Sequence, residues 1–133
     1  MGLVDSPVLV AIKKQLHAAT VTQQVIANNV ANVNTPGFKK SSVRFTEELR
    51  QALDSKMMPL ATTHPRHIPT AVTLTRVEPM VVKEEDTTMG YNRNNVDIEQ
   101  EMVNLSVNTL SYQAATRALG DRLSLLGYVI RGR

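Results

Sequence analysis

A heptad pattern of apolar residues runs through the last quarter of the chain and restricts it to a long helix with one packed face. Between residues 97 and 130, positions whose spacing alternates between four and three form a stripe in which eight of ten residues are apolar. The stripe consists of Ile98, Met102, Leu105, Thr109, Tyr112, Thr116, Leu119, Leu123, Leu126 and Ile130. A repeat of this kind predicts a helix that buries the stripe against another helix.

The ends of this segment carry residues that favour helix termini. Asp97, Glu99 and Glu101 lie in the opening turns, where carboxylates interact favourably with the helix dipole, and two arginines follow the last residue of the stripe. Asn94 or Asn95 can cap the helix, because an asparagine oxygen accepts bonds from free amide groups. We therefore expect a helix over residues 97–130.

A second helix is expected at the other end of the chain, over residues 6–33. Ser6 is a suitable N-cap, and Pro7 fits the first helical position, where its missing N–H is not needed. The segment carries its own heptad stripe of Leu9, Ile12, Leu16, Ala19, Gln23, Ile26, Val30 and Val33. Pro36 and Gly37 then end the helix in a turn.

Residues 34–96 have a different character and are expected to form a turn and a partly irregular arm. A shorter helix is predicted near residues 44–54, where Phe45, Leu49 and Leu53 recur at a spacing of four. Four of the six prolines lie in residues 55–95, which disfavours regular structure there. The β-prone segment 70–77 allows one small β-hairpin.

These segments predict an all-α fold of one domain over residues 1–133, with two long terminal helices paired as an antiparallel coiled coil. With two Phe, three Tyr and no Trp, its core must depend on aliphatic and Met side chains. A lone helix pair leaves part of each stripe in water, so we expect further burial from neighbouring copies of the chain. The residues expected to pack in this way are Leu9, Ile12, Leu16, Ile26, Val30, Ile98, Met102, Leu105, Tyr112, Leu119, Leu123, Leu126 and Ile130.

Charge and composition argue against several classes of protein. Fifteen basic and twelve acidic residues give a net charge of +3, too thin a basic surface for a nucleic-acid groove with aromatic platforms. The N-terminus has no basic region followed by an apolar run, so we expect no cleaved signal peptide. No stretch reaches the roughly 18 apolar residues of a spanning helix, so we expect no membrane insertion. The chain has no cysteine, which excludes disulfides and thiol chemistry.

Enzyme activity, a metal and a cofactor are not expected. The best metal candidate is the pair His64 and His67, but Pro65 and Pro69 deny it a helix, and neither a cysteine nor an acidic residue lies close by. A turn whose prolines fix its shape explains this segment. The chain contains none of the glycine-rich nucleotide motifs or the serine nucleophile motif.

The run ANNVANVNTPGFKK over residues 27–40 is unusual. A helix end with an asparagine cap and a Pro-Gly turn explains residues 34–37, but not four asparagines within seven positions, because asparagine is a mediocre helix former. The amides of Asn28, Asn29 and Asn32 would suit places where helices from different copies meet, since each donates and accepts hydrogen bonds.

This run resembles the signature of the flagellar rod and hook proteins. In that family an asparagine pair, Thr-Pro-Gly and an aromatic-basic element occur at fixed offsets after an N-terminal heptad helix. Residues 94–119, NNVDIEQEMVNLSVNTLSYQAATRAL, resemble the matching C-terminal helix, and with THPRHI the likeness covers nearly the whole chain. Val30 departs slightly from the commoner Leu or Ile. The signature residues are Asn28, Asn29, Ala31, Asn32, Thr35, Pro36, Gly37 and Phe38.

The resemblance implies a structural subunit of the proximal rod of the bacterial flagellar basal body, because the longer distal-rod and hook subunits carry inserted domains. Such subunits self-assemble through their terminal helices into the hollow drive shaft that crosses the periplasm. The resemblance also implies export by the flagellar type III apparatus without signal cleavage. The implied partners are copies of the chain, other rod subunits and the rod–MS-ring junction protein.

Three alternatives remain open. The sister proximal-rod subunit of the same family is the nearest, although it tends to have an interrupted turn where this chain has an unbroken Thr35-Pro36-Gly37. A cytoplasmic coiled-coil interaction protein would share the heptads but not the asparagine-rich turn. A small nucleic-acid binder is favoured only by the basic balance of the chain.

Overall fold

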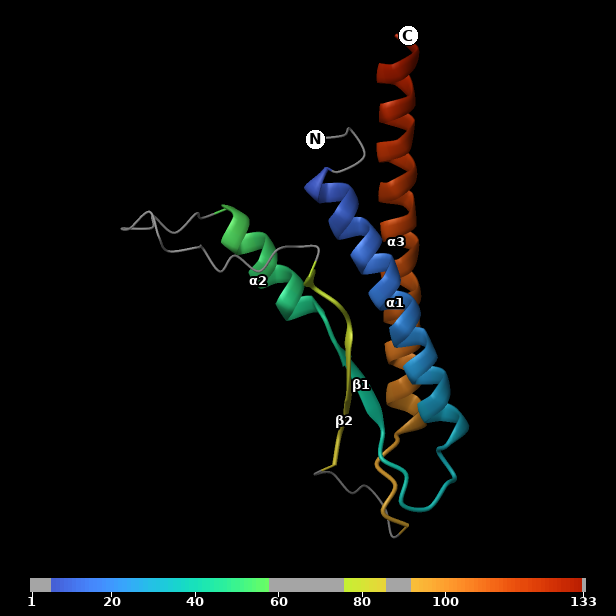
Figure 1. The fold of residues 1–133 in the computed structure, drawn as a ribbon. Coiled ribbons are helices and arrows are strands. Elements are labelled where there is room, and N and C mark those ends of the chain that lie inside the picture. The colour runs from blue at the N-terminus through green and yellow to red at the C-terminus, as the bar shows by residue number, and fades with distance from the viewer. Residues whose placement is uncertain (1–5, 58–75, 86–91, 133) are drawn as a thin grey trace, which may run out of the picture.

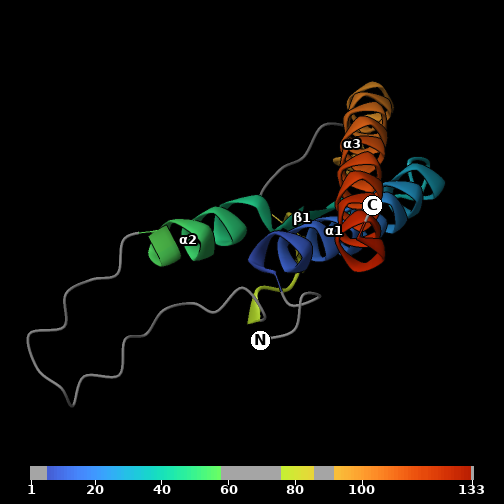
Figure 2. The ribbon, with the colours of Figure 1, turned by 90° about the horizontal axis from the view of Figure 1, so that it is seen from above.

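The fold is built around two long antiparallel helices. A computed structural model describes residues 6–57, 76–85 and 92–132. The elements follow in the order α1 (Pro7–Ala31), β1 (Ser41–Arg44), α2 (Thr46–Met57), β2 (Met80–Lys83) and α3 (Ile98–Arg131). Helices α1 and α3 run side by side in opposite directions, and α2 lies on the side of α1 away from α3 (Figures 1 and 2). The predicted pair of terminal helices is confirmed.

Helix α1 begins at Pro7, as the proline signal predicts, with Ser6 as the preceding residue; the side chain of Ser6 makes no capping bond. The helix ends at Ala31, two residues before the predicted end. Tight turns replace the last predicted residues, because Val33 N donates to Val30 O at 3.2 Å and Thr35 N donates to Asn32 O at 3.0 Å. The reversal is completed at Gly37, whose φ of 72° is a backbone conformation that glycine tolerates well.

Helix α3 runs from Ile98 to Arg131, close to the predicted range of 97–130. Its N-cap is Asp97 and neither of the two asparagines expected in that role: Asp97 Oδ1 accepts bonds from Glu99 N at 2.9 Å and Gln100 N at 3.3 Å. A carboxylate caps a helix as well as an asparagine amide does. At the other end, Gly132 has a left-handed conformation and donates to Tyr128 O at 3.1 Å.

The small sheet is a pairing of two distant segments. Strands β1 and β2 are antiparallel, with Ser41 opposite Lys83 and Arg44 opposite Met80, whereas the sequence suggested one hairpin within the arm near residues 70–77. Of that β-prone segment, residues 76 and 77 are not in a strand and residues 70–75 lie outside the described residues, as do His64 and His67. The short helix predicted at 44–54 is present as α2, which begins at Thr46.

A small apolar core joins α1 to α2 and the strands. It consists of Ala18, Phe45, Ala52 and Val77, with Val10, Val43 and Leu49 packed around it. Outside this core, Lys14 on α1 donates a short side-chain bond to Glu78, just before β2. This bond holds the pKa of the exposed Glu78 carboxyl below its ordinary value. The core therefore lies on one side of α1, and α3 packs on another.

Candidate functional site

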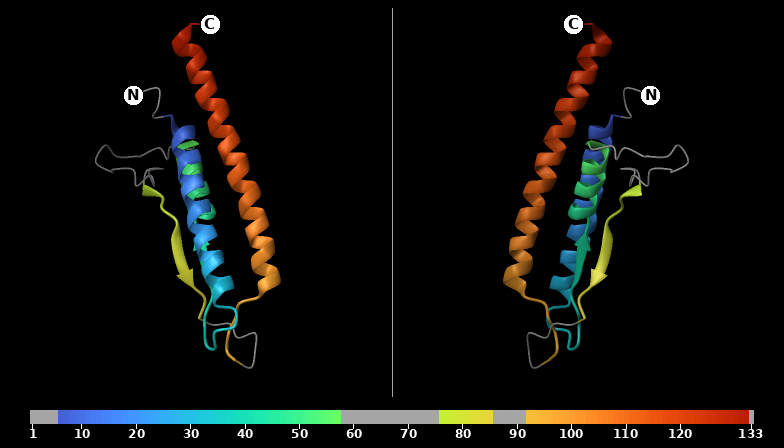
Figure 3. Two further views of the ribbon diagram at one scale, coloured as in Figure 1. Left: turned by 90° about the vertical axis from the view of Figure 1, so that its right-hand side faces the viewer. Right: turned by 90° about the vertical axis from the view of Figure 1, so that its left-hand side faces the viewer.

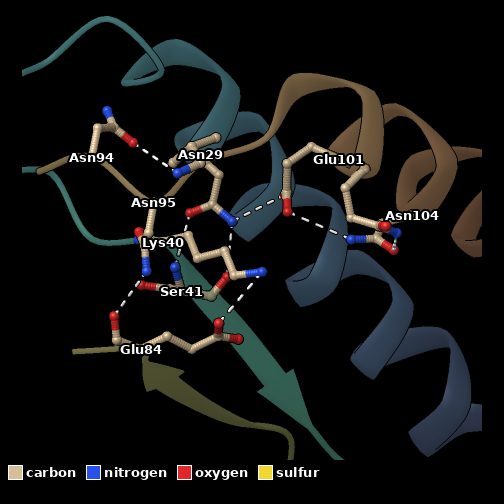
Figure 4. A network of polar contacts seen from close by, with 10 residues as sticks. Asn29, Lys40, Ser41, Glu84, Asn94, Asn95, Glu101 and Asn104 are labelled. Carbon is tan, nitrogen blue, oxygen red and sulfur yellow. Dashed lines mark hydrogen bonds and ion pairs between the residues drawn. The ribbon is translucent and has the colours of Figure 1, made fainter. Parts of the chain in front are cut away.

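The asparagine-rich signature lies at the end of the molecule where α1 stops and α3 starts. There the turn after α1, the first residues of β1, the segment after β2 and residues 92–97 come together (Figures 1 and 4). Three of the four buried polar residues of this region are asparagines: Asn29, Asn94 and Asn95, with exposed fractions of 1%, 5% and 1%. The fourth is Glu101, at 3%. Buried polar groups need partners, so their contacts define the junction.

Asn29 connects α1 to both β1 and α3. Its Oδ1 accepts a bond from Ser41 N at 3.0 Å, and its Nδ2 donates to Ser41 O at 2.8 Å. The same Nδ2 donates to Glu101 Oε2 at 3.0 Å (Figure 4). The side-chain amide thus pairs with Ser41 as a neighbouring strand would, and it also holds the first turn of α3.

Asn94 closes the turn after α1. Its Nδ2 lies 2.9 Å from each of the carbonyl oxygens of Asn32, Val33 and Thr35. These carbonyls lie at the end of a helix, where no further turn supplies N–H donors. Asn94 Oδ1 accepts a bond from Val96 N at 2.7 Å. The side chain therefore bridges the signature turn and the segment that leads into α3.

Asn95 joins β1, β2 and the start of α3. Its Oδ1 accepts a bond from Lys40 N at 2.6 Å, and its Nδ2 donates to Glu84 O at 3.0 Å. The hydrogen bonds between the two strands continue there, because Glu84 N donates to Lys40 O at 3.0 Å. Lys40 Nζ also lies 3.4 Å from Glu84 Oε2 (Figure 4). The side chain of Asn95 therefore hydrogen-bonds to the backbone of both strands just beyond their paired residues.

Glu101 was predicted to act only through the helix dipole, but the structure buries it against α1. Its Oε2 accepts the bond from Asn29, and its Oε1 accepts a longer one from Asn104 Nδ2 at 3.5 Å. A buried carboxylate is costly unless donors surround it, so these amides stabilise it. In the described part of the chain every buried side-chain nitrogen and oxygen has a hydrogen-bond partner.

The signature residues divide into two groups. Asn29, Asn32 and Thr35 use their side chains within the chain, since Asn32 Nδ2 donates to Asn28 O at 2.8 Å and Thr35 Oγ1 donates to Asn32 Oδ1 at 3.3 Å. Asn28, Ala31, Pro36 and Gly37 are exposed, and Phe38 is half-buried. The expectation that all three helix amides serve contacts between copies is therefore wrong for Asn29, whose partners are intramolecular.

The residues that complete this junction, Asn94, Asn95 and Glu101, were assigned other roles in the sequence analysis. Glu101 lies outside the predicted heptad stripe, so the sequence does not mark it as a residue that faces α1. The roles of Asn94 and Asn95 depend on contacts with residues about 60 and 55 positions earlier in the chain, which local patterns do not contain.

The two helices meet along a face of α3 that differs from the predicted stripe. Gln15 Nε2 donates to Ser111 Oγ at 3.1 Å, and Asn108 Nδ2 donates to Ala19 O at 2.9 Å. The α3 residues that are buried or half-buried in the paired region are Glu101, Leu105, Asn108, Ser111, Ala115 and Leu119. This face is partly polar, and only two of its members belong to the heptad stripe.

The other predicted packing residues on α3 are largely exposed. Ile98, Met102 and Tyr112 are 48%, 41% and 44% exposed, and Leu123 and Ile130 are 54% and 77% exposed. Leu126 is half-buried. On α1, Ile26 is buried, and the remaining predicted residues, Leu9, Ile12, Leu16 and Val30, are half-buried. A single copy of the chain therefore covers most of the α1 stripe and leaves most of the α3 stripe in water.

Neither a metal-binding cluster nor a membrane-spanning helix occurs among the residues that the structure describes. Among residues 6–57, 76–85 and 92–132, no three histidine or acidic side chains lie close enough together to hold a metal ion. Within the same residues, none of the helices combines the length and the apolar character needed to cross a lipid bilayer.

Comparison with known proteins identifies close relatives. The family model described as "Flagella basal body rod protein" matches residues 16–39, which contain the signature run. A protein named flagellar basal body rod protein FlgB from Bacillus subtilis is 32% identical over 121 residues, covering 91% of each chain. The protein of that name from Borreliella burgdorferi is 30% identical over 89% of this chain and 91% of its own. The Salmonella typhimurium FlgB is 25% identical over 90% of both chains.

Proposed function

The chain belongs to the flagellar basal body rod protein family and is a structural subunit of the rod, and from this premise we propose that it assembles by packing its terminal helices against neighbouring copies. The observation that supports this proposal is the uncovered apolar surface of α3. Soluble proteins rarely leave such a surface in water unless it is an interaction site. The surface includes Ile98, Met102, Tyr112, Leu123 and Ile130.

The thin core of the chain supports the same proposal. Among the residues that the structure describes, the buried apolar ones are Ala18, Ala19, Ile26, Phe45, Ala52 and Val77, and half of these are alanines, which contribute little area. Ordering the backbone costs about 1–2 kcal/mol per residue, so a core of this size gives little net stability. Burial of the α3 stripe by other copies would supply the remaining free energy of folding, as in proteins whose folding is linked to assembly.

The relatives of the chain bear the name FlgB. This name supports the proposal that the chain is the FlgB-type subunit of the proximal rod, and it disfavours the sister proximal-rod subunit and a cytoplasmic coiled-coil protein. We propose that its partners are copies of itself, other rod subunits and the rod–MS-ring junction protein. We also propose that the flagellar type III apparatus exports it without cleavage of a signal peptide. In this proposal the chain has no catalytic role and needs no cofactor.

Charged substitutions in the exposed α3 stripe test the assembly surface. Leu123→Asp and Ile130→Asp, expressed in a strain that lacks the native copy, should reduce swimming to below about a tenth of wild type, because each places a charge in a contact between copies. The matched control is Gln113→Asp, an exposed polar position on the same helix, which should swim normally. The chain should be present in isolated basal bodies for the control and absent for the two stripe variants.

Export and assembly are separated by measuring the chain outside the cytoplasm. If the variants fail only in assembly, they should still leave the cytoplasm at the level of the Gln113→Asp control. Normal motility of both stripe variants would contradict the proposed surface. Absence of the wild-type chain from basal bodies would contradict a role in the rod.

A further inference from the structure

Helix α3 continues well past the point where α1 begins, and this extension has an unusual surface. The bonds from Gln15 to Ser111 and from Asn108 to Ala19 set an antiparallel register in which Pro7 lies level with about residue 119. Residues 120–131 of α3, here called the overhang, therefore extend beyond the described part of α1 (Figure 3). At about 1.5 Å per residue the overhang is about 18 Å long.

The overhang exposes large apolar side chains on more than one side. Leu123, Leu125, Tyr128, Val129 and Ile130 are between 54% and 77% exposed, and at about 100° per residue they point in different directions around the helix. Large apolar side chains exposed in such number normally mark an interaction surface. Contact with one flat surface would cover only part of it, so the overhang fits best into a groove.

The chain has such a groove between α1, β1 and α3, nearer the other end of α3. It has a volume of about 400 Å³, and its apolar lining includes Ala19, Val25, Ile26, Val43, Phe45 and Val107. An apolar cavity of about 150 Å³ holds one benzene, so the groove has room for two or three large side chains. Leu123, Leu126 and Ile130 lie at spacings of three and four, and so form one ridge of that size on the overhang.

The charges of the two surfaces are complementary. The overhang carries Arg122 and Arg131 against one acid, Asp121, a net charge of +1. The groove lining carries Glu84 and Glu101 against one base, Lys40, a formal net charge of −1. Lys40 is paired with Glu84, so the unbalanced charge is that of the buried Glu101. Electrostatic complementarity of this kind favours one orientation of the partners and raises their rate of association.

We propose that the overhang of one copy of the chain inserts into the groove between α1, β1 and α3 of the next copy. The inference rests on the proposed function, since it assigns the partner and the contact for rod assembly. The overhang and this groove lie in different places on each copy, so the contact is head-to-tail. A row of copies joined in this way has a free overhang at one end and a free groove at the other, so further copies can be added.

A disulfide ladder tests this contact, because the chain has no cysteine of its own. In the double variant Val107→Cys/Ile130→Cys one thiol lies in the groove and the other on the overhang. The two residues are 23 positions apart on one helix, or about 34 Å, and a disulfide needs Cα atoms within about 7 Å. A single copy therefore cannot close this bond. Under mild oxidation of flagellated cells we expect dimers, trimers and longer multimers on a non-reducing gel.

The single variants and a displaced thiol are the controls. Val107→Cys alone and Ile130→Cys alone should remain monomeric, and so should Gln113→Cys/Ile130→Cys, whose first thiol lies outside the groove lining. A double variant that stays monomeric although it fractionates with basal bodies under reducing conditions overturns the head-to-tail contact. So does a dimer from Ile130→Cys alone, which would mean that two overhangs meet.

Filling the groove provides a second, independent measurement. Val107 is 61% exposed, so Val107→Trp leaves the fold of one copy intact and places a large ring where the overhang would enter. We expect at least a tenfold loss of the chain from basal bodies, with Gln113→Trp at the wild-type level. Normal recovery of Val107→Trp would overturn the groove contact while the role in the rod still held, whereas absence of the wild-type chain from basal bodies would overturn both.

Discussion

At the scale of single residues, the side-chain amide of Asn29 binds both the backbone of β1 and a carboxylate of α3. Its amide carries a donor and an acceptor, as a peptide group does, and with Ser41 it makes the pair of bonds that a further strand would make. This satisfies one position on the outer edge of β1, and unpaired strand edges are sites of unwanted pairing between chains. The bond to Glu101 then fixes α3 against the same point.

Replacing Asn29 tests this arrangement. Asn29→Ala should lower the free energy of unfolding by about 2–4 kcal/mol, because it leaves the buried Glu101 carboxylate and the half-buried backbone of Ser41 with fewer hydrogen-bond partners. Asn28→Ala is the matched control, since the neighbouring side chain is exposed, and its effect should stay within about 0.5 kcal/mol. Urea unfolding followed by circular dichroism at one fixed protein concentration measures both. Equal midpoints for the two variants would contradict the role assigned to Asn29.

The sequence identified Asn29 as a residue that helix propensity alone does not explain, but it did not identify the partner. Its partners lie 12 and 72 positions away, and no local pattern links them. Glu101 was misassigned for a related reason. A carboxylate in the first turn of a helix always has a sufficient explanation in the dipole, so nothing in the sequence required a second role.

At the scale of elements, heptad spacing and terminal residues predicted the two long helices to within two residues at their ends. The same spacing predicted the wrong contact face for α3. Heptad analysis counts only apolar residues, whereas the observed face includes Glu101, Asn108 and Ser111, which bond to α1 through polar groups. These bonds turn α3 so that Ile98 and Met102 face away from α1. Strands β1 and β2 are four residues each, too short for a pairing across residues 45–79 to be predicted.

The N-cap of α3 gives a prediction for that element. Asp97→Ala removes the acceptor for Glu99 N and Gln100 N, and it should lower the free energy of unfolding by about 0.5–2 kcal/mol. Asp97→Asn keeps a hydrogen-bond acceptor in the same place, so it should lower the free energy of unfolding by much less than Asp97→Ala does. Thermal unfolding of the three chains at equal concentration measures the difference. An Asp97→Asn chain as unstable as Asp97→Ala would mean that charge and not capping geometry matters here.

At the scale of the whole molecule, the two ends of the helix pair have opposite character. At the junction end, buried asparagines and Glu101 satisfy one another within one copy, and the groove lies beside them. At the other end, the overhang presents leucine, valine, tyrosine and isoleucine side chains to water. A polar end that carries the groove and an end that carries the exposed apolar overhang give the subunit a direction. A shaft built from head-to-tail contacts needs such a direction, because a symmetric contact would close after two copies.

This asymmetry predicts that the stability of the chain depends on its own concentration. If each copy gains burial by inserting its overhang into another, a tenfold rise in concentration favours the associated, folded state by up to about 1.4 kcal/mol. For a chain of this size the midpoint of thermal unfolding should then rise by a few degrees Celsius. Leu123→Asp is the control, because it places a carboxylate in the apolar ridge that enters the groove and so opposes its burial, and its midpoint should not move with concentration. Circular dichroism melts over a hundredfold range of concentration make the comparison. Equal midpoints for the wild-type chain across that range would mean that one copy already buries all that its stability requires, and the overhang would then lose its role as the link between subunits.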